Sequence, residues 1–432
     1  MTVKLGAGLF WPVAALGAFA LWPARATAQP PPPTSAQVRV TLDQAIDMAR
    51  THNHALLAAR TTILQNQAQE ITANLRPNPV LLGDSQFLPL FQPSTFSSDY
   101  LANNAQFDVG LSYLFERGDK RQHRLQAARD QTAVTTAQVT DNERTLTFNV
   151  ASQFVAALLA QSQLDFAQQD LTSFQQTVDI SQDRFNAGAM SEGDLLKIKL
   201  QLLQFQMDVS SARLARLQAL ATLRQLLGYE SVPESYGVDG ALAYQPVPLT
   251  EDQLRELALR DRPDLRAAQL AVTAAQSQHS LAQANAKRDV TAQASYTHVA
   301  GTNTASLFAN IEVPIFDRNQ GEIARTQHVI AQSQELSTEQ TSIVLTDVTN
   351  AYESLHTSEQ VVKLYESGYR QQAEDSRNIS QYAYQRGAAT LLDFLDAQRS
   401  YRATELAYRQ ALANYMVGLE QLRQAVGTRS LP

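Results

Sequence analysis

One loop motif occurs twice in this chain, 199 positions apart, within long helical stretches. The copies run from Phe185 to Leu196 and from Tyr384 to Leu395. Matched positions carry an aromatic residue, Gly-Ala, a hydroxyl residue, an aspartate and two apolar residues. A motif repeated at a fixed spacing indicates a duplicated structural unit rather than a catalytic centre. We therefore predict two structural repeats, 41–240 and 241–432.

Each predicted repeat contains a very long segment that favours a helix. Residues 119–187 lack Gly and Pro, and residues 322–386 contain only Gly368. At 1.5 Å per residue, the first helix would be about 100 Å long. Apolar residues recur at steps of three and four, which favours lateral packing as in a coiled coil. Each long helix is predicted to end in a tip loop and a return helix, with these ranges: 188–193 and 194–227, then 387–392 and 393–426.

A further helix opens each repeat, from Thr41 as a plausible N-cap in the first and near Thr250 in the second. Between that helix and the long one, each repeat contains a predicted β-hairpin, at about 80–116 and about 290–316. The clearest strands are Phe107–Phe115 and Leu307–Ile315, where apolar residues alternate with polar or small ones. Weaker strands are predicted at 80–91 and 290–301, with loops at 92–105 and 302–306. Such strands suit either a small soluble antiparallel sheet or a tilted crossing of a bilayer.

The N-terminus resembles a secretory signal peptide. Lys4 precedes the apolar run Leu5–Leu21, and Ala26-Thr27-Ala28 suits cleavage after Ala28. An uncleaved membrane anchor is the alternative. Residues 1–28 are therefore predicted to be the signal peptide, and residues 29–40 a Pro-rich tether.

Composition narrows the function classes. The chain has no cysteine, so we expect neither a disulfide framework nor a lipid anchor. Only 18% of residues are charged and the net charge is −7, which disfavours nucleic acid as a partner. No nucleophile elbow, phosphate loop or zinc-protease motif occurs, so we predict neither an enzyme nor a cofactor.

The exported chain, its strands and its rods together favour a duct. A sheet in lipid must close on itself, and bacterial barrels need about eight strands or more. Four strands per chain are too few, so we expect three copies to form a barrel of 12 strands. The predicted fold is mainly α with a small β part, in which long antiparallel helical hairpins extend the barrel as an α-barrel.

The mature chain resembles the TolC-type outer-membrane efflux proteins. The resemblance rests on four landmarks in the right order: Thr41–Ala45, Arg76-Pro-Asn-Pro79, the doubled Gly-x-x-Ser/Thr-x-x-Asp loops, and Tyr415–Gly427. It implies a homotrimer in outer-membrane lipid of a Gram-negative cell, with an α-helical tunnel in the periplasm. It also implies a passive exit channel that works with a periplasmic adaptor and an energised inner-membrane pump.

Two motifs resemble the branch that exports heavy-metal cations such as cobalt, zinc and cadmium. They are Leu114–Arg121 and Val313–Glu322, which open the two long helices. That branch usually has two adjacent glycines where this chain has Gly118-Asp119. The resemblance implies a proton-driven pump of the resistance-nodulation-division type. Drugs, organic compounds or secreted polypeptides remain the alternative cargo, and a soluble periplasmic coiled-coil adaptor is the alternative of another class.

The resemblance also implies site residues. Asp393 and Asp396 match the carboxylates of the periplasmic constriction, although two carboxylates near a helix start are also common on solvated surfaces. Asp194 and Tyr384 match positions that latch the moving helices when the channel is closed. An arginine that is typical of the family's latch is replaced here by Ala389. The tips where the adaptor docks contain Gly188, Ser191, Gly387 and Thr390.

His52 and His54 suggest a metal site only at first sight. Side chains two positions apart on a helix point in different directions, and no Cys or His cluster accompanies them. We expect structural or surface roles and predict no resident metal.

Overall fold

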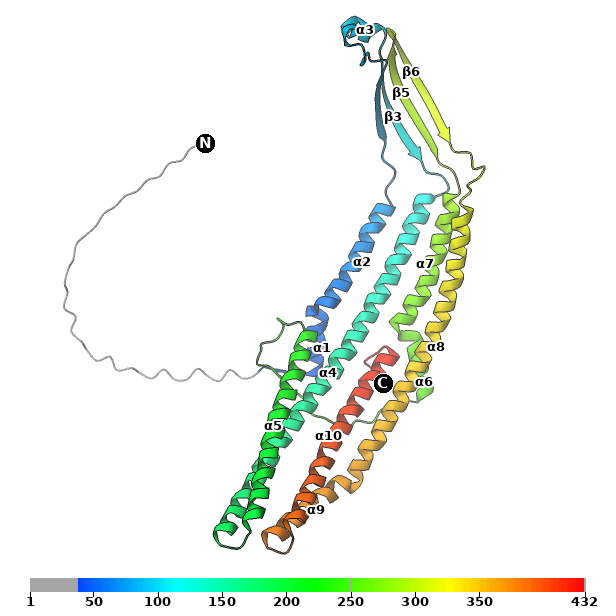
Figure 1. Ribbon diagram of the computed structural model, residues 1–432. Helices are drawn as coiled ribbons and strands as arrows, with labels where there is room; N and C mark the ends of the chain where they lie inside the picture. The colour runs from blue at the N-terminus through cyan, green and yellow to red at the C-terminus, as the bar shows by residue number, and fades with distance from the viewer. Residues whose placement is uncertain (1–37, 249, 431–432) are drawn as a thin grey trace, which may run out of the picture. The chain divides into compact units, whose positions relative to one another are not determined.

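The computed structural model describes residues 38–248 and 250–430 (Figure 1). The predicted signal peptide 1–28 and tether residues 29–37 lie outside the described residues. The last predicted tether residues, Arg39–Val40, instead form strand β1, which pairs in parallel with β4, Gly237–Val238. The N–H of Gly237 donates to the Val38 carbonyl at 2.9 Å, so this pairing ties the start of the first repeat to its end.

The first repeat opens with two helices where the sequence predicts one. Asn53 adopts an extended backbone conformation (φ −68°, ψ 114°), and its side chain accepts the N–H of Leu56 at 3.0 Å. Asn53 therefore ends one helix and caps the next. Thr41 forms the predicted N-cap. The elements are α1 Leu42–His52, α2 His54–Ala73, β2 Val80–Gln86, α3 Ser98–Asn103, β3 Gln106–Phe115, α4 Lys120–Asn186 and α5 Glu192–Leu227, with a 3₁₀ turn at Pro93–Thr95.

The second repeat follows the same order. Arg262 (φ −71°, ψ 122°) interrupts its opening helix as Asn53 does in the first repeat, and Pro263 begins the next helix. The elements are α6 Glu251–Asp261, α7 Pro263–Asn285, β5 Val290–Val299, β6 Thr302–Ile311, α8 Gln320–Leu364, α9 Arg370–Gln385 and α10 Leu391–Val426.

The long helix predicted at 322–386 is not continuous. A π-helical turn at Tyr365–Tyr369 separates α8 from α9, and Gly368 within it has φ +124° and ψ −13°. Glycine reaches this conformation because it lacks a Cβ atom. The ribbon bends where α8 passes into α9 (Figure 1).

The four strands β2, β3, β5 and β6 form one antiparallel sheet in the order β2-β3-β5-β6. The predicted strand at 307–315 is shifted: β6 begins at Thr302 and ends at Ile311, so the predicted loop 302–306 belongs to the strand. The connection is short because Ala300 and Gly301 both have positive φ, which suits a two-residue hairpin turn. Val313 and Ile315 follow the strand.

The two faces of the sheet differ in chemistry. Leu81, Leu111, Ala294 and Leu307 lie opposite one another across all four strands, on an apolar face. On the other face the corresponding row is polar and consists of Asp84, Asp108, Thr297 and Thr304. Large apolar side chains of the first face are solvent-exposed in the single chain, for example Leu307 at 86%.

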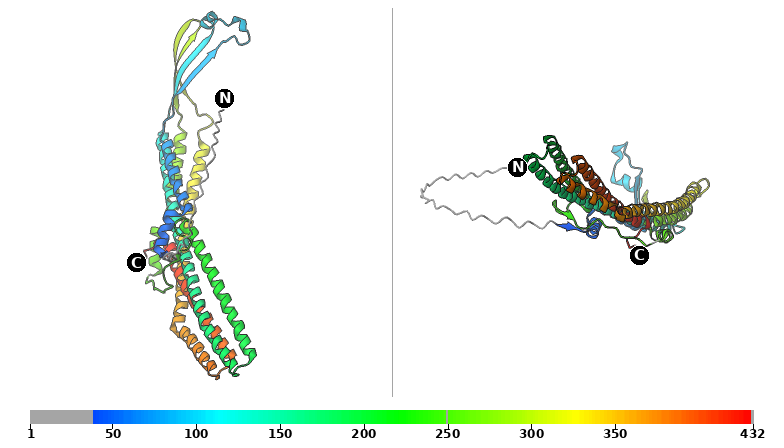
Figure 2. Two further views of the ribbon diagram at one scale, coloured as in Figure 1. Left: turned by 90° about the vertical axis from the view of Figure 1, so that its left-hand side faces the viewer. Right: turned by 90° about the horizontal axis from the view of Figure 1, so that it is seen from below.

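The sheet lies at one end of the helices, and the α4–α5 and α9–α10 turns lie at the other end (Figures 1 and 2). Helix α4 contacts α1 and α2 along one part and α5 along another, so the shorter helices stack beside the long one. Three apolar clusters join the helices: one at the middle of α4, one along the second half of α8 and one near the turns. The prediction of a mainly α protein with one four-stranded antiparallel part is confirmed.

Among the described residues, no helix combines the length and the apolar character needed to span a membrane.

Candidate functional site

The two turns far from the sheet contain the four residues predicted to form the tips. Gly188 and Gly387 have φ +71° and +76°, the left-handed conformation expected of turn glycines. Ser191 accepts the N–H of Asp194 at 3.1 Å, and Thr390 accepts that of Asp393 at 3.2 Å. In each turn, one helix ends, a glycine reverses the chain, and a hydroxyl residue caps the next helix.

An aromatic cluster holds the two helical hairpins together beside the turns. Phe174 of α4 stacks on Phe205 of α5 with ring centroids 4.4 Å apart. Tyr384 of α9 stacks on Phe394 of α10 at 5.4 Å. Phe174 also stacks on Phe394, so the cluster is continuous from one hairpin to the other.

Asp393 and Asp396 both lie exposed on the first turns of α10. Asp393 accepts the Thr390 N–H at 3.1 Å and its hydroxyl at 2.6 Å, which lowers the pKa of this carboxyl. Asp396 lies 3.4 Å from Arg399, whose side chain is as exposed as its own. Arg399 was not singled out in the sequence, although its spacing of three from Asp396 predicts a contact.

Asp194 and Tyr384 are not hydrogen-bonded to each other in the described structure. Asp194 accepts hydrogen bonds from Ser191 and Lys197. Both lower the pKa of its carboxyl, and the bond from Ser191 has the larger effect. The hydroxyl of Tyr384 is buried and has no hydrogen-bond partner among the described residues. Arg184 of α4 donates to the Tyr384 carbonyl at 2.8 Å and thereby links the two hairpins.

A buried carboxylate lies farther from the turns, between the same hairpins. Asp170 of α4 accepts the side-chain amide of Gln398 at 2.7 Å, and Arg402 Nε lies 2.7 Å from its other oxygen. Arg402 also pairs with Asp208 of α5. Burial raises the pKa of Asp170 to about 6, against the lowering effect of Arg402. Sequence reasoning missed this residue, although Phe166 and Phe174 lie four positions before and after it on a buried face.

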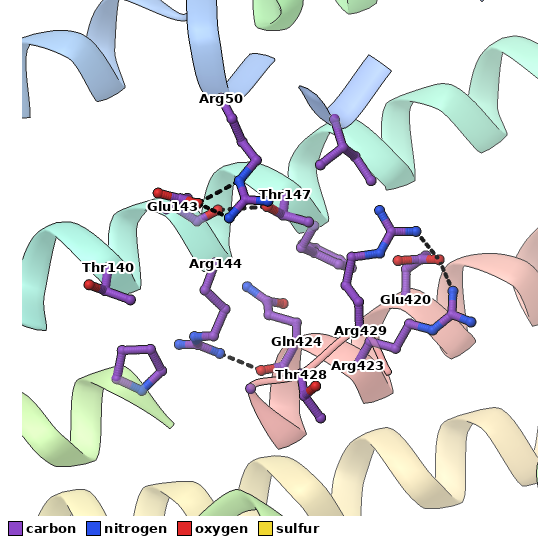
Figure 3. Close-up of a pocket in the computed structure, with 14 residues that line it drawn as sticks. Arg50, Thr140, Glu143, Arg144, Thr147, Glu420, Arg423, Gln424, Thr428 and Arg429 are labelled. Atoms are coloured by element: carbon purple, nitrogen blue, oxygen red, sulfur yellow. Dashed lines mark hydrogen bonds and ion pairs between the residues drawn. The ribbon is translucent and has the colours of Figure 1, made fainter. Parts of the chain in front are cut away.

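A cavity of about 310 Å³ lies near the middle of α4, where the two repeats meet (Figure 3). Its charged lining residues are Arg50, Arg144, Arg423, Arg429, Glu143 and Glu420. Burial acts to raise the pKa of Glu143, but hydrogen bonds from Arg50 and Arg60 lower it overall. Glu420 pairs with Arg423 and Arg429, and Arg144 donates to the Gln424 carbonyl. The charged side chains that line the cavity are thus paired with one another or with the backbone of the same chain. We therefore interpret the cavity as part of the packing between the two repeats rather than as a binding site.

No group of three or more His, Cys, Asp or Glu side chains that could hold a metal ion occurs in the part of the chain described here. His52 contacts the Met48 carbonyl, and His54 lies 3.4 Å from Glu230. The two histidines therefore have separate local partners.

The family model described as outer membrane efflux protein matches residues 45–229 and 254–428. The chain is 24% identical to the cobalt-zinc-cadmium resistance protein CzcC of Cupriavidus metallidurans over 383 residues, covering 87% of each chain. It is 26% identical to the pyoverdine export outer membrane protein OpmQ of Pseudomonas putida over 410 residues, covering 89% of this chain and 85% of OpmQ. The crystal structure of the outer membrane protein VceC of Vibrio cholerae has the same fold, with a TM-score of 0.72, 18% identity, and coverage of 90% of this chain and 96% of VceC.

Proposed function

This chain belongs to the outer membrane efflux protein family, and from that premise we propose that three copies close into one conduit that exports metal cations. The protein is an outer-membrane efflux channel of the Gram-negative envelope with a periplasmic helical part, and it is not an enzyme.

The proposal rests on one observation: the four-stranded sheet of the single chain has two free edges. β2 and β6 each have one neighbouring strand in the sheet, so each presents unpaired backbone groups on its outer side. Unpaired backbone groups are very costly in lipid, and closure into a barrel removes them. Three copies would supply 12 strands, with the apolar face toward lipid and the row of Asp84, Asp108, Thr297 and Thr304 toward the lumen.

The helices support the same closure. Leu196, Leu200, Leu203 and Met207 are spaced along one side of α5 at steps of four, three and four, and all are more than half exposed. Leu64 and Ile71 of α2, and Leu75 just after its end, are similarly exposed. Apolar stripes of this length normally pack against another helix. A neighbouring copy is the partner that also closes the sheet.

The proposed constriction is formed by Asp393 and Asp396. In a trimer these residues would present six carboxylates around the axis, and rings of carboxylates favour cations. Arg399 beside Asp396 would moderate the charge. Tyr384, whose buried hydroxyl lacks a partner in the described chain, would donate a hydrogen bond to the Asp194 carboxylate in the closed assembly. Because Ala389 replaces the arginine typical of the family's latch, Arg184 would supply a further link between the hairpins.

The tips at Gly188, Ser191, Gly387 and Thr390 are the proposed docking points of a periplasmic adaptor. The inner-membrane pump would be a proton-driven transporter of the resistance-nodulation-division type, which supplies the energy. We place metal cations first as cargo because the motifs at 114–121 and 313–322 resemble the metal branch and CzcC is among the relatives. Export of an organic compound is the second candidate, because the pyoverdine exporter OpmQ is similarly close.

Two experiments test these proposals. Purified protein should be a trimer that conducts ions in planar bilayers, and cation block should weaken at least tenfold in the double variant Asp393→Ala, Asp396→Ala. Asp375→Ala, an exposed carboxylate on α9, is the control and should retain block. Unchanged cation block in the double variant would mean that Asp393 and Asp396 do not form the constriction.

Cargo is tested in a deletion strain. The metal proposal expects sensitivity to cobalt, zinc and cadmium that the wild-type protein restores. Sensitivity to organic toxicants with normal metal tolerance would establish the second candidate instead.

A further inference from the structure

Basic residues gather where the sheet meets the helices. We define the collar as the four segments that border the strands at this end: 74–79, 116–124, 287–289 and 312–325. The collar contains nine basic and six acidic residues, a net charge of +3, whereas the whole chain has a net charge of −7. The rest of the chain is therefore acidic, whereas the collar is basic. Figure 1 shows the junction of the sheet with α2, α4, α7 and α8, where these segments lie.

Most of the acidic side chains in the collar are already paired. Lys120 lies 2.8 Å from Asp289, Arg124 2.8 Å from Glu116, Arg288 3.1 Å from Glu312, and Arg325 2.6 Å from Glu322. The Arg117 backbone N–H donates to Asp289 at 2.8 Å, and the Arg117 charge acts on the same carboxylate. The four remaining cationic side chains form no hydrogen bond or ion pair with any described residue: Arg76, Arg121, Lys287 and Arg318. The collar thus has more cations than its own carboxylates can neutralise.

Two of these cations line a cavity of about 300 Å³ between the segment before β2, the end of β3 and the start of α4. The other charged lining residues are Lys120, Glu116 and Asp119. Arg76 and Arg121 share it with Tyr113 and Phe115, whose rings meet edge to face at 4.9 Å. Tyr113 and Phe115 are the last residues of the apolar face of β3, and Phe115 is half exposed. Guanidinium groups therefore adjoin the aromatic end of the apolar face.

We propose that the collar binds the phosphate-bearing headgroups of anionic phospholipids in the periplasmic leaflet, with Arg76, Arg121, Lys287 and Arg318 as the contacting cations. The inference rests on the proposed membrane position of the sheet. Arginine binds phosphate oxygens through paired N–H donors, and aromatic residues at the end of an apolar band lie at headgroup depth. Basic clusters at that depth select anionic lipids.

Closure of the trimer would add a second reason for a bound anion. Val80 begins β2 and Ile311 ends β6, so both lie at the collar end of the two free edges. Pairing of these edges would bring Arg76 of one copy toward Arg318 of the next. Two unpaired guanidinium groups repel each other, so a bridging anion fits the seam better than direct contact between the copies. The collar would then carry three times the charge of +3 around the barrel.

The test measures lipid retention. Detergent-purified protein is incubated with equal amounts of dioleoyl phosphatidylglycerol and dioleoyl phosphatidylcholine, and the lipids retained by the trimer are counted by native mass spectrometry. We expect at least fivefold preference for phosphatidylglycerol. The triple variant Arg121→Gln, Lys287→Gln, Arg318→Gln should reduce the preference to less than twofold. The control triple variant Arg39→Gln, Arg213→Gln, Arg266→Gln removes the same charge from exposed positions outside the collar and should retain it.

Three results would overturn the proposal: equal retention of both lipids by the wild type, undiminished preference in the collar variant, or loss of the preference when millimolar inorganic phosphate is added. The last result would indicate a site for free anions. Dissociation of the collar variant into monomers with unchanged lipid preference would assign the cations to contacts between copies. Conductance in pure phosphatidylcholine bilayers is recorded in parallel, because channels there support the proposed function whatever the lipid result.

Discussion

At the scale of the residue, both long helices begin at a left-handed backbone position. Asp119 (φ +55°, ψ 28°) precedes α4, and Asn319 (φ +60°, ψ 21°) precedes α8. Asp and Asn tolerate this conformation better than other non-glycine residues. The resembled metal branch usually has glycine at the position of Asp119, and the positive φ explains both choices.

We therefore predict that Asp119→Val destabilises the protein by about 1–2 kcal/mol, because a β-branched residue is strained at positive φ. Asp119→Asn should leave stability nearly unchanged. Thermal unfolding of the purified proteins measures both effects. Equal midpoints for the valine variant and the wild type would mean that the backbone at this position differs from the one described.

Asp170 predicts a specific pH dependence. Its folded pKa of about 6 lies above the ordinary value of 3.8. The folded state thus binds a proton on Asp170 more tightly than the unfolded state does. This proton binding stabilises the folded state at low pH, and the stabilisation is lost as pH rises from about 4 through 6. Between pH 7 and pH 4.5, wild type should gain on the order of 2 kcal/mol relative to Asp170→Asn. Thermal midpoints at both pH values test this, with Asp165→Asn, an exposed site on the same helix, as the control. A pH-independent difference between wild type and Asp170→Asn would contradict it.

At the scale of the element, the sequence pattern predicted the strands and turns whose position depends on neighbouring residues. The alternation of apolar and polar residues located β3 to within one residue, and the repeated glycines located both turns. Both features depend only on residues that are close in sequence. The same pattern misplaced the start of β6, since Thr302–Ser306 are mostly polar residues of an edge strand and resemble a loop in sequence. Asp170 could not be identified as buried, because its surroundings come from α5, α9 and α10, far away in sequence. Asp194 lies in the first turn of α5, where it contacts the N-cap Ser191 and Lys197 instead of Tyr384.

The π-helical turn leads to an element-scale prediction. Gly368 has space around it, so only its backbone conformation excludes other residues. Gly368→Ala should destabilise the protein by about 1–2 kcal/mol. Gly321→Ala, in the first turn of α8 where φ is not positive, should instead stabilise by up to about 0.5 kcal/mol. Opposite shifts of the thermal midpoint are expected, and a gain in both variants would mean that α8 and α9 can join without the turn.

At the scale of the whole molecule, the exposed stripe on α5 distinguishes an isolated chain from a closed assembly. Leu200 is 69% exposed in the single chain, so Leu200→Asp should not disturb the fold of one copy. Against a neighbouring copy the same carboxylate would be buried without a partner, which costs several kcal/mol. We predict that the variant keeps its helical circular dichroism, elutes as a monomer in detergent and forms no channels. Gln206→Asp adds the same charge to a polar exposed site on α5 and should remain a conducting trimer. A trimeric Leu200→Asp variant with normal conductance would show that α5 does not form the seam, and the proposed closure would then need a different helical face.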